Sequence, residues 1–478
     1  MEEKRKDKNR ELKVTVYIFL SLFLVLIAYF AFYVQFRAPK QINNSYNMRQ
    51  KNLEKQVIRG TIYSSKGEVL ARQALDPEGK EVRFYPFANL FAHAVGFSTY
   101  GNYGLEKTAN IELLTSNAPV KERVSKEMSG LRNTGDNIYT TYDRDMQLAA
   151  YQALGSYRGA AVVLEAKTGR ILAMVSKPDY DPNTVGDNWD EISNNNEESP
   201  LLNRAVQGLY PPGSTFKIVT ALEYIREHPD DYSDYRYSCI GRISEGDTSI
   251  ECFHGSVHGT VDLLTSFAKS CNCSFANIGL KADAPVFSDT ADSLLFNRVL
   301  PLDMDYKRSE FSLSSVSSAE DRMLEAIGQG KVLVTPMHMA LITEAIANDG
   351  VMMKPMEIIR QENYQGRIIE SYEPQEYKRI MSSQEAALLR SFMTEVVKTG
   401  TGRKLKEAFY TTAGKTGSAE FGTVKGRSHA WFTGFSNVED PDIVVTVILE
   451  GAGNGSEYAV PAAKWIFDAY HAKYGGTP

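Results

Sequence analysis

The stretch Pro211–Glu223, PPGSTFKIVTALE, places a serine at the start of a predicted helix and a lysine one turn later. The two prolines and the glycine that open it do not fit a helix interior, so the helix begins at or just after Ser214. Backbone N–H groups are free in a first helical turn, and the helix dipole is positive there. Lys217 shares a helix face with Ser214, within hydrogen-bond reach. This spacing predicts a nucleophilic Ser214 with Lys217 as its base, if burial and a second cation lower the pKa of the lysine from about 10.4.

The same spacing occurs a second time, in SFAK at Ser266–Lys269. The buried face of that predicted helix is expected to consist of Leu264, Phe267, Ala268 and Cys271. Ser266 would then point away from the core, and no turn precedes it to aim its hydroxyl. We therefore reject Ser266 as a nucleophile.

Two further motifs follow Ser214 in the chain: Ser270-Cys271-Asn272 at the end of a predicted helix, and Lys415-Thr416-Gly417 on a predicted strand. S-x-x-K, S-x-N and K-T-G in this order form the set shared by serine β-lactamases and penicillin-binding proteins. Lys415 lies inside a strand-like run between two glycines, where another backbone or a ligand can approach closely. Three ordered motifs are far more specific than any one of them.

Other copies of these motifs have simpler explanations. K-T-G at Lys167–Gly169 lies at a predicted hairpin tip, and K-T-G at Lys398–Gly400 lies at a predicted helix C-terminus. S-x-N also occurs at Ser45–Asn47 and Ser193–Asn195. We therefore expect Lys415 to be the functional lysine.

With these motifs, the stretches RGTIYSSKGEVLA (Arg59–Ala71), AIGQGKVLVTP and HAWFTGF make the chain resemble a class B penicillin-binding protein, a monofunctional peptidoglycan transpeptidase. The resemblance runs from about residue 59 to residue 464. It implies an α+β fold: a serine β-lactamase-like transpeptidase domain with an antiparallel sheet covered by helices, on a small membrane-proximal domain. The hairpin predicted at Gly159–Ser176, the three strand-like runs between Thr411 and Gly451 and the helix after them agree with such a sheet.

The resemblance also implies roles for the motif residues. Ser214 would attack the carbonyl between the two terminal D-alanines of a peptidoglycan stem peptide, and an amine from a neighbouring stem peptide would resolve the ester. Ser270 and Asn272 would relay a proton to the leaving amine and hold the substrate amide. Lys415 would lower the pKa of Lys217 and, with the substrate-binding residues Thr416, Gly417 and Ser418, hold the terminal carboxylate. The backbone N–H groups of Ser214 and Ser418 would form the oxyanion hole, and β-lactam antibiotics would acylate the same serine.

Two departures from the family pattern stand out. Ser418 occupies a position where threonine is usual, which keeps a hydroxyl but loses a methyl group. Ser64 and Ser65 stand where the family often has Asp-Arg, so the ion pair expected there is in doubt. Neither departure touches the proposed chemistry.

The chain is expected to have four parts: a cytoplasmic tail (1–13), a transmembrane anchor (14–36), a membrane-proximal non-catalytic domain (37–145) and the transpeptidase domain (146–478). The anchor has no charge and, at about 1.5 Å per residue, is long enough to cross a bilayer. More Lys and Arg residues precede the anchor than directly follow it, which favours a cytoplasmic N-terminus and an extracytoplasmic catalytic domain. Arg59 and Glu106 are expected to support the membrane-proximal domain.

The cysteines and histidines leave alternatives open. Cys239 and Cys252 bracket a short polar hairpin and could form a disulfide. With His254 and His258 they could form a zinc cluster, but their separation exceeds the usual two to four residues, so we predict no metal and no cofactor. Cys271 and Cys273 are expected to fill core space, and His429 to border the cleft from a strand without acting as a base.

The composition and the rival functions bear on which partners are expected. The net charge of −6 comes with no basic stripe, so no nucleic acid is expected. Rival hypotheses are a D,D-carboxypeptidase or β-lactamase that hydrolyses the same acyl-enzyme, and a β-lactam-binding division scaffold with vestigial activity. The residues before the transpeptidase domain are too few for a glycosyltransferase, so a separate membrane glycosyltransferase and elongation or division proteins are expected partners.

Overall fold

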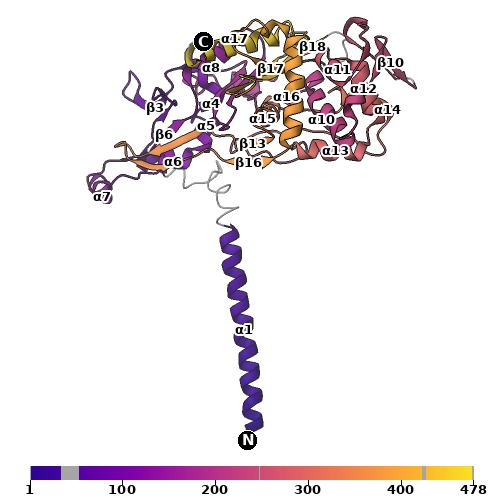
Figure 1. The fold of residues 1–478 in the computed structure, drawn as a ribbon. Coiled ribbons are helices and arrows are strands. Elements are labelled where there is room, and N and C mark those ends of the chain that lie inside the picture. The colour runs from indigo at the N-terminus through magenta and orange to yellow at the C-terminus, as the bar shows by residue number, and fades with distance from the viewer. Residues whose placement is uncertain (1, 34–52, 247, 422–426, 476–478) are drawn as a thin grey trace.

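The computed structural model describes residues 2–33, 53–246, 248–421 and 427–475 (Figure 1). Helix α1 (Glu2–Phe32) contains a span, Arg10–Phe32, with a mean hydropathy of 2.5 and no buried residue. This helix is long and apolar enough to cross a membrane, in agreement with the expected anchor. The last residues of that anchor, the linker after it and the Ser45–Asn47 motif lie outside the described residues.

The membrane-proximal region is built on a six-stranded sheet with the order β15-β14-β6-β2-β3-β4. Its strands are β2 (Ile62–Tyr63), β3 (Val69–Leu75), β4 (Glu81–Phe84), β6 (Asn137–Thr140), β14 (Ile358–Glu362) and β15 (Ile368–Ser371). Strands β2 and β3 pair antiparallel within the stretch RGTIYSSKGEVLA. Strands β14 and β15 come from far along the chain, and β14 pairs antiparallel with β6. The sequence analysis did not indicate that this later segment completes the sheet.

Short elements surround this sheet. They are β1 (Val57–Ile58), which pairs in parallel with β5 (Asn133–Thr134), and the helices α4 (Ala92–Val95), α5 (Gly104–Thr108), α6 (Asn110–Leu114) and α7 (Val120–Met128). A buried ion-pair cluster joins them: the Glu106 carboxylate on α5 accepts from Arg59 Nε and from Arg83 Nε, both at 2.6 Å. Burial acts to raise the pKa of Glu106, but the two guanidinium groups outweigh it and lower that pKa. The expected supporting role of Arg59 and Glu106 is confirmed.

The C-terminal region contains a five-stranded antiparallel sheet with the order β17-β18-β19-β7-β8. Its strands are β7 (Gly159–Glu165), β8 (Ile171–Lys177), β17 (Thr412–Glu420), β18 (Ser428–Ser436) and β19 (Ile443–Leu449). The predicted hairpin and the predicted three-stranded meander are therefore both confirmed, and β19 pairs with β7 to join them into one sheet.

Helices cover both faces of this sheet. Along β19, Val444 and Ile448 pack into the core on the side of α15 (Pro336–Ala347), whereas Val445 and Val447 face the opposite core with α8 (Arg144–Ala153) and α17 (Ala459–Tyr474). Every residue of α15 is buried, as expected for a helix that is apolar on all sides. The alternation along β19 is that of a strand between two helical layers.

Most of the remaining helices lie at the end of the molecule away from the six-stranded sheet (Figure 1). The helices are α9 (Trp189–Asn194), α10 (Lys217–Glu227), α11 (Leu263–Ala268), α12 (Asn272–Lys281), α13 (Ala284–Ser293), α14 (Ala319–Ala326) and α16 (Ser383–Lys398). The strand pairs are β9 (Tyr237–Cys239) with β12 (Gly259–Val261), β10 (Arg242–Glu245) with β11 (Thr248–Glu251), and β13 (Val351–Met353) with β16 (Glu376–Arg379). The β10–β11 pair confirms the predicted polar hairpin.

Candidate active site

Ser214 lies in a single 3-10 turn, Gly213–Phe216, that leads directly into α10. Gly213 has a φ of 53°, and a Cβ atom there would lie 2.7 Å from the carbonyl oxygen of Ser418. Only glycine fits this position, because it needs both a left-handed backbone and the missing side chain. The Gly213 N–H also donates to the Gly328 carbonyl at 2.8 Å. The turn therefore holds Ser214 against strand β17.

Lys217 is fully buried and points its amine at the S-x-N motif. Its Nζ donates to the Asn272 Oδ1 at 2.7 Å and to the Ser270 carbonyl at 2.8 Å, and lies 3.3 Å from the Ser270 Oγ. Burial lowers the pKa of Lys217 to about 8. A substantial fraction of this lysine is therefore neutral near neutral pH, as a general base requires.

The direct contact predicted between Ser214 and Lys217 is not made. Over the ranges that the structure covers, the Ser214 hydroxyl has no hydrogen-bond partner, and the Lys217 amine is engaged by Ser270 and Asn272. Catalytic hydrogen bonds are often long in the absence of substrate and tighten in the complex. The free hydroxyl is consistent with a nucleophile that still has to meet its substrate.

Lys415 approaches the same serine of the S-x-N motif from β17. It is fully buried, and its Nζ donates to the Ser270 Oγ at 2.9 Å and to the Thr416 carbonyl at 3.0 Å. Burial and the nearby Lys217 ammonium together hold the pKa of Lys415 well below its usual value. Burial is the main cause that lowers the pKa of Lys217. Repulsion between two ammonium groups acts on both of them, so the expected effect of Lys415 on Lys217 stays a prediction.

The S-x-N motif forms the turn between α11 and α12, so it begins a helix as well as following one. Ser270 has a φ of 56°, a left-handed conformation that is rare for a residue with a side chain and is often found at functional sites. Cys271 is the N-cap residue of α12, and Asn272 is its first residue. The Asn272 Nδ2 donates to the Glu251 carbonyl at 3.0 Å, which fixes the amide with its oxygen toward Lys217.

The remaining K-T-G residues line the same strand. The Thr416 hydroxyl lies 2.5 Å from the Thr401 hydroxyl, and the Ser418 Oγ accepts from the Gly455 N–H at 3.1 Å. The close approach predicted for the glycines is confirmed at Gly417, where a Cβ atom would lie 3.0 Å from the Pro212 carbonyl oxygen. Sequence reasoning missed Thr401, although it directly follows the K-T-G at Lys398–Gly400.

Residues 159–468 match the family described as "Penicillin binding protein transpeptidase domain", and residues 59–138 match "Penicillin binding protein A dimerisation domain". This chain belongs to the penicillin-binding proteins. Its class B resemblance and its α+β transpeptidase fold are confirmed. The peptidoglycan D,D-transpeptidase PbpA of Mycolicibacterium smegmatis is 31% identical over 410 residues, which cover 81% of this chain and 83% of that protein.

Two solved structures are similar to this penicillin-binding protein. The imipenem acyl-enzyme complex of penicillin-binding protein A from M. tuberculosis is 27% identical, covers 87% of this chain and 99% of its own, and gives a TM-score of 0.79. The D,D-transpeptidase domain of a peptidoglycan glycosyltransferase from Eggerthella lenta is 30% identical, with 88% and 99% coverage and a TM-score of 0.77.

The other copies of the K-T-G and S-x-N motifs in the described residues lie at an exposed helix end, at a hairpin turn or on an exposed short helix. Lys398 is the exposed last residue of α16, and Lys167 lies at the β7–β8 turn, where it pairs with Asp440. Ser193 is exposed near the end of α9. These positions confirm the structural explanations given for the two lysines.

The expected orientation of Ser266 is wrong. Ser266 is completely buried, because α12 packs against that side of α11, and its Oγ accepts from the Ser274 hydroxyl at 2.8 Å. Leu264, expected in the core, is only half-buried. A buried and hydrogen-bonded hydroxyl cannot meet a peptide substrate, so the rejection of Ser266 as nucleophile stands on a different reason.

His429 lies on β18, as expected for a strand residue. Its ring stacks on Phe421 with centroids 4.0 Å apart, and its Nδ1 accepts from the Gly451 N–H at 3.2 Å. Burial lowers the pKa of His429 to about 4, so the ring is neutral at physiological pH. Its accepting nitrogen is already satisfied, which leaves His429 a packing role.

The cysteine region of this penicillin-binding protein differs from both alternatives left open. All four cysteines are free, buried and gathered in one cluster, with the Cys239 and Cys252 sulfurs 3.7 Å apart. His258 joins this cluster, whereas His254 is exposed and its ring packs at an angle against Phe253. The long separation of the cysteines in the chain was therefore a poor guide to their separation in space.

Proposed function

We propose that this penicillin-binding protein cross-links peptidoglycan as a serine D,D-transpeptidase, with Ser214 as the acylated residue. The observation that carries the proposal is the convergence of two buried lysines, Lys217 and Lys415, on the hydroxyl of Ser270, beside the turn that presents Ser214. Two buried ammonium groups repel each other and lack solvation, so at least one is readily held neutral. A neutral lysine beside a serine at a helix start is an activated nucleophile pair.

The first half-reaction forms an ester and releases D-alanine. Ser214 Oγ attacks the carbonyl carbon of the D-Ala-D-Ala bond while Lys217 Nζ accepts the hydroxyl proton. The backbone N–H groups of Ser214 and Ser418 stabilise the oxyanion of the tetrahedral intermediate. The proton then passes from Lys217 through the Ser270 hydroxyl to the leaving nitrogen, which departs as the amine of D-alanine.

The second half-reaction reverses these proton movements. The amine of a neighbouring stem peptide attacks the ester carbonyl, its proton returns along the same path, and Ser214 leaves as the alcohol. During the first half-reaction, Lys415 and the Thr416 and Ser418 hydroxyls hold the terminal carboxylate of the donor peptide, while Asn272 holds its amide. β-Lactams enter the same first step, because ring opening forms an ester on the same oxygen.

The membrane arrangement is also proposed. Helix α1 anchors the protein, its N-terminus lies in the cytoplasm, and the folded body lies outside, where peptidoglycan is assembled. The excess of basic residues ahead of the apolar span supports this orientation. The proposed partners are a separate membrane glycosyltransferase, which makes the glycan strands, and elongation or division proteins.

Labelling with a fluorescent penicillin tests the assignment of the nucleophile. Ser214→Ala is expected to abolish labelling, and Ser266→Ala is expected to retain it, because Ser266 is buried. Mass spectrometry of the penicillin-treated protein should place the adduct on the peptide that contains Ser214. An adduct on any other serine would overturn the proposal.

A second assay separates transfer from hydrolysis. The protein is incubated with a donor stem peptide ending in D-Ala-D-Ala, with and without an acceptor amine. A transpeptidase should give a cross-linked product and a long-lived penicillin adduct, whereas a carboxypeptidase or β-lactamase would give only hydrolysed product. If the Ser214→Ala variant alone supported growth of a strain that depends on this protein, the result would instead indicate a scaffold.

A further inference from the structure

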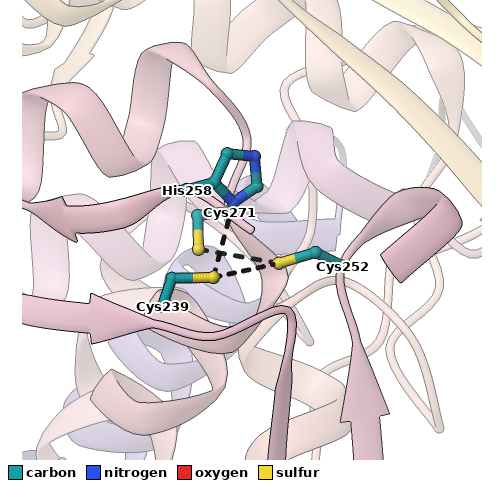
Figure 2. Close-up of side chains that lie close together, drawn as sticks. All are labelled: Cys239, Cys252, His258 and Cys271. Atoms are coloured by element: carbon teal, nitrogen blue, oxygen red, sulfur yellow. Dashed lines mark hydrogen bonds between the residues drawn. The ribbon is translucent and has the colours of Figure 1, made fainter. Parts of the chain in front are cut away.

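Four side chains from separate segments converge beside the S-x-N motif (Figure 2). Cys239 ends β9, Cys252 follows β11, His258 directly precedes β12, and Cys271 is the N-cap residue of α12. The three sulfurs and one histidine nitrogen all lie within 4.8 Å of one another. The cysteines are buried and His258 is half-buried.

The distances within this group match the edges of a tetrahedral zinc site. With Zn–S bonds of about 2.3 Å, two sulfurs of a tetrahedron lie about 3.8 Å apart, and a sulfur and a nitrogen lie about 3.5 Å apart. The Cys252 sulfur lies 3.7 Å from the Cys239 sulfur and 3.7 Å from the Cys271 sulfur. The Cys239 sulfur lies 3.5 Å from His258 Nδ1.

The same distances do not fit a disulfide. A disulfide needs sulfurs about 2.05 Å apart. The Cys252 sulfur is 3.7 Å from both the Cys239 sulfur and the Cys271 sulfur. Simple core filling does not explain the arrangement either, because an imidazole nitrogen points at a buried sulfur rather than at an oxygen or at water. Three thiolates and one imidazole are the donors that zinc prefers.

We propose that Cys239, Cys252, His258 and Cys271 bind one zinc ion as a structural site. Four protein ligands complete a tetrahedron and leave no open position for water or substrate, so the site is structural rather than catalytic. The metal would tie the ends of two small strand pairs to the first turn of α12. A zinc ion at this place would also account for the three free, buried thiols that meet there.

The position of Cys271 gives the site a consequence for catalysis. Cys271 lies between Ser270 and Asn272, whose side chains contact both catalytic lysines. A metal on Cys271 would fix the left-handed turn at Ser270 and the start of α12. Its ligands would thus act as positioning residues for the S-x-N motif. This step rests on the proposed function, whereas zinc binding does not.

Metal content of the full-length protein, purified in detergent without added zinc, tests the site directly. We expect about one zinc per chain, and loss of most of it in Cys252→Ser and His258→Ala. Two matched controls should keep their zinc. Cys273→Ser removes a buried cysteine whose sulfur lies 3.4 Å from Cys252 but outside the four-atom group, and His254→Ala removes the exposed neighbouring histidine.

Cobalt substitution identifies the ligands without relying on variants that could fail to fold. Wild-type protein stripped by a chelator and given Co²⁺ should show the visible bands of a tetrahedral site and near-ultraviolet sulfur-to-cobalt charge transfer. Wild-type protein without zinc whose intact mass shows a Cys239–Cys252 disulfide would overturn the proposal. Zinc retained in both Cys252→Ser and His258→Ala, or a cobalt spectrum without sulfur bands, would overturn it as well.

Acylation kinetics test the positioning role separately. Zinc-stripped protein should react with penicillin about 10- to 100-fold more slowly, and Zn²⁺, but not Mg²⁺, should restore the rate. An unchanged rate in zinc-free protein would refute the positioning role while leaving the metal site intact. Zinc-replete protein that forms no adduct on Ser214 would instead refute the proposed function.

Discussion

The burial of Lys217 predicts how acylation of Ser214 depends on pH. The lysine must be neutral to accept the serine proton, so the rate follows its neutral fraction. With a pKa of about 8, that fraction is about 9% at pH 7, half at pH 8 and about 91% at pH 9. The acylation rate should therefore rise about tenfold between pH 7 and pH 9 and level off above pH 9.

An unburied lysine would give a different curve. With the ordinary pKa of 10.5, the neutral fraction would rise about 100-fold over the same interval and would still be rising at pH 9.5. The size of the rate increase between pH 7 and pH 9, and the pH at which the rate levels off, therefore report the desolvation of Lys217. The sign is also fixed, because a base that must lose a proton before it acts becomes more active as the pH rises.

The measurement is the second-order rate constant for acylation by a fluorescent penicillin, at concentrations well below saturation and from pH 6 to pH 9.5. Under these conditions the profile reports pKa values of the free enzyme. Lys398→Ala, a change at an exposed helix end, should give the same curve. A rate independent of pH over this range, or a rise with no plateau by pH 9.5, would refute the role assigned to the buried amine.

Two further predictions address the third motif and the membrane-proximal region. Lys415→Ala should slow acylation by about 100-fold or more, because it removes the amine that donates to Ser270 and that, in the proposed mechanism, holds the substrate carboxylate. Lys398→Ala should leave the rate unchanged, and the opposite ranking in the penicillin assay would move the motif to residue 398. Glu106→Gln should lower the free energy of unfolding by about 3–5 kcal/mol, because it leaves two buried guanidinium groups without a countercharge. A denaturation midpoint equal to that of the wild type would show that Arg59 and Arg83 find other partners.

The residues that carry the proposed chemistry were accessible from sequence because each motif has a local structural cause. The glycine before Ser214 is needed by its own turn, and Gly417 is needed where the Pro212 backbone approaches. The false copies could be rejected in the same way, since Lys167 and Lys398 lie at a hairpin turn and a helix end. The local sequence signals sufficed here even though Gly417 meets a backbone segment that lies far away in the chain.

The features that sequence did not indicate all depend on distant neighbours. Ser266 is buried because α12 covers a second side of α11, and a single-helix pattern assumes one buried side. Cys271 and Cys252 meet through a turn and a strand pair that no short motif describes. Strands β14 and β15 could be recognised as a hairpin, but their pairing with β6 depends on the arrangement of the whole chain.

The pairing of β6 with β14 builds one sheet from two segments that lie far apart in the chain. A fragment that begins after residue 145 would lack β6, so one edge of β14 would expose unpaired backbone donors and acceptors. Such an edge favours edge-to-edge association. The same strand lies between α15 and α16 in the chain, and α16 leads to the loop whose Thr401 touches Thr416. A displacement of the six-stranded sheet can therefore reach β17 through the chain and the hydrogen bond between Thr401 and Thr416.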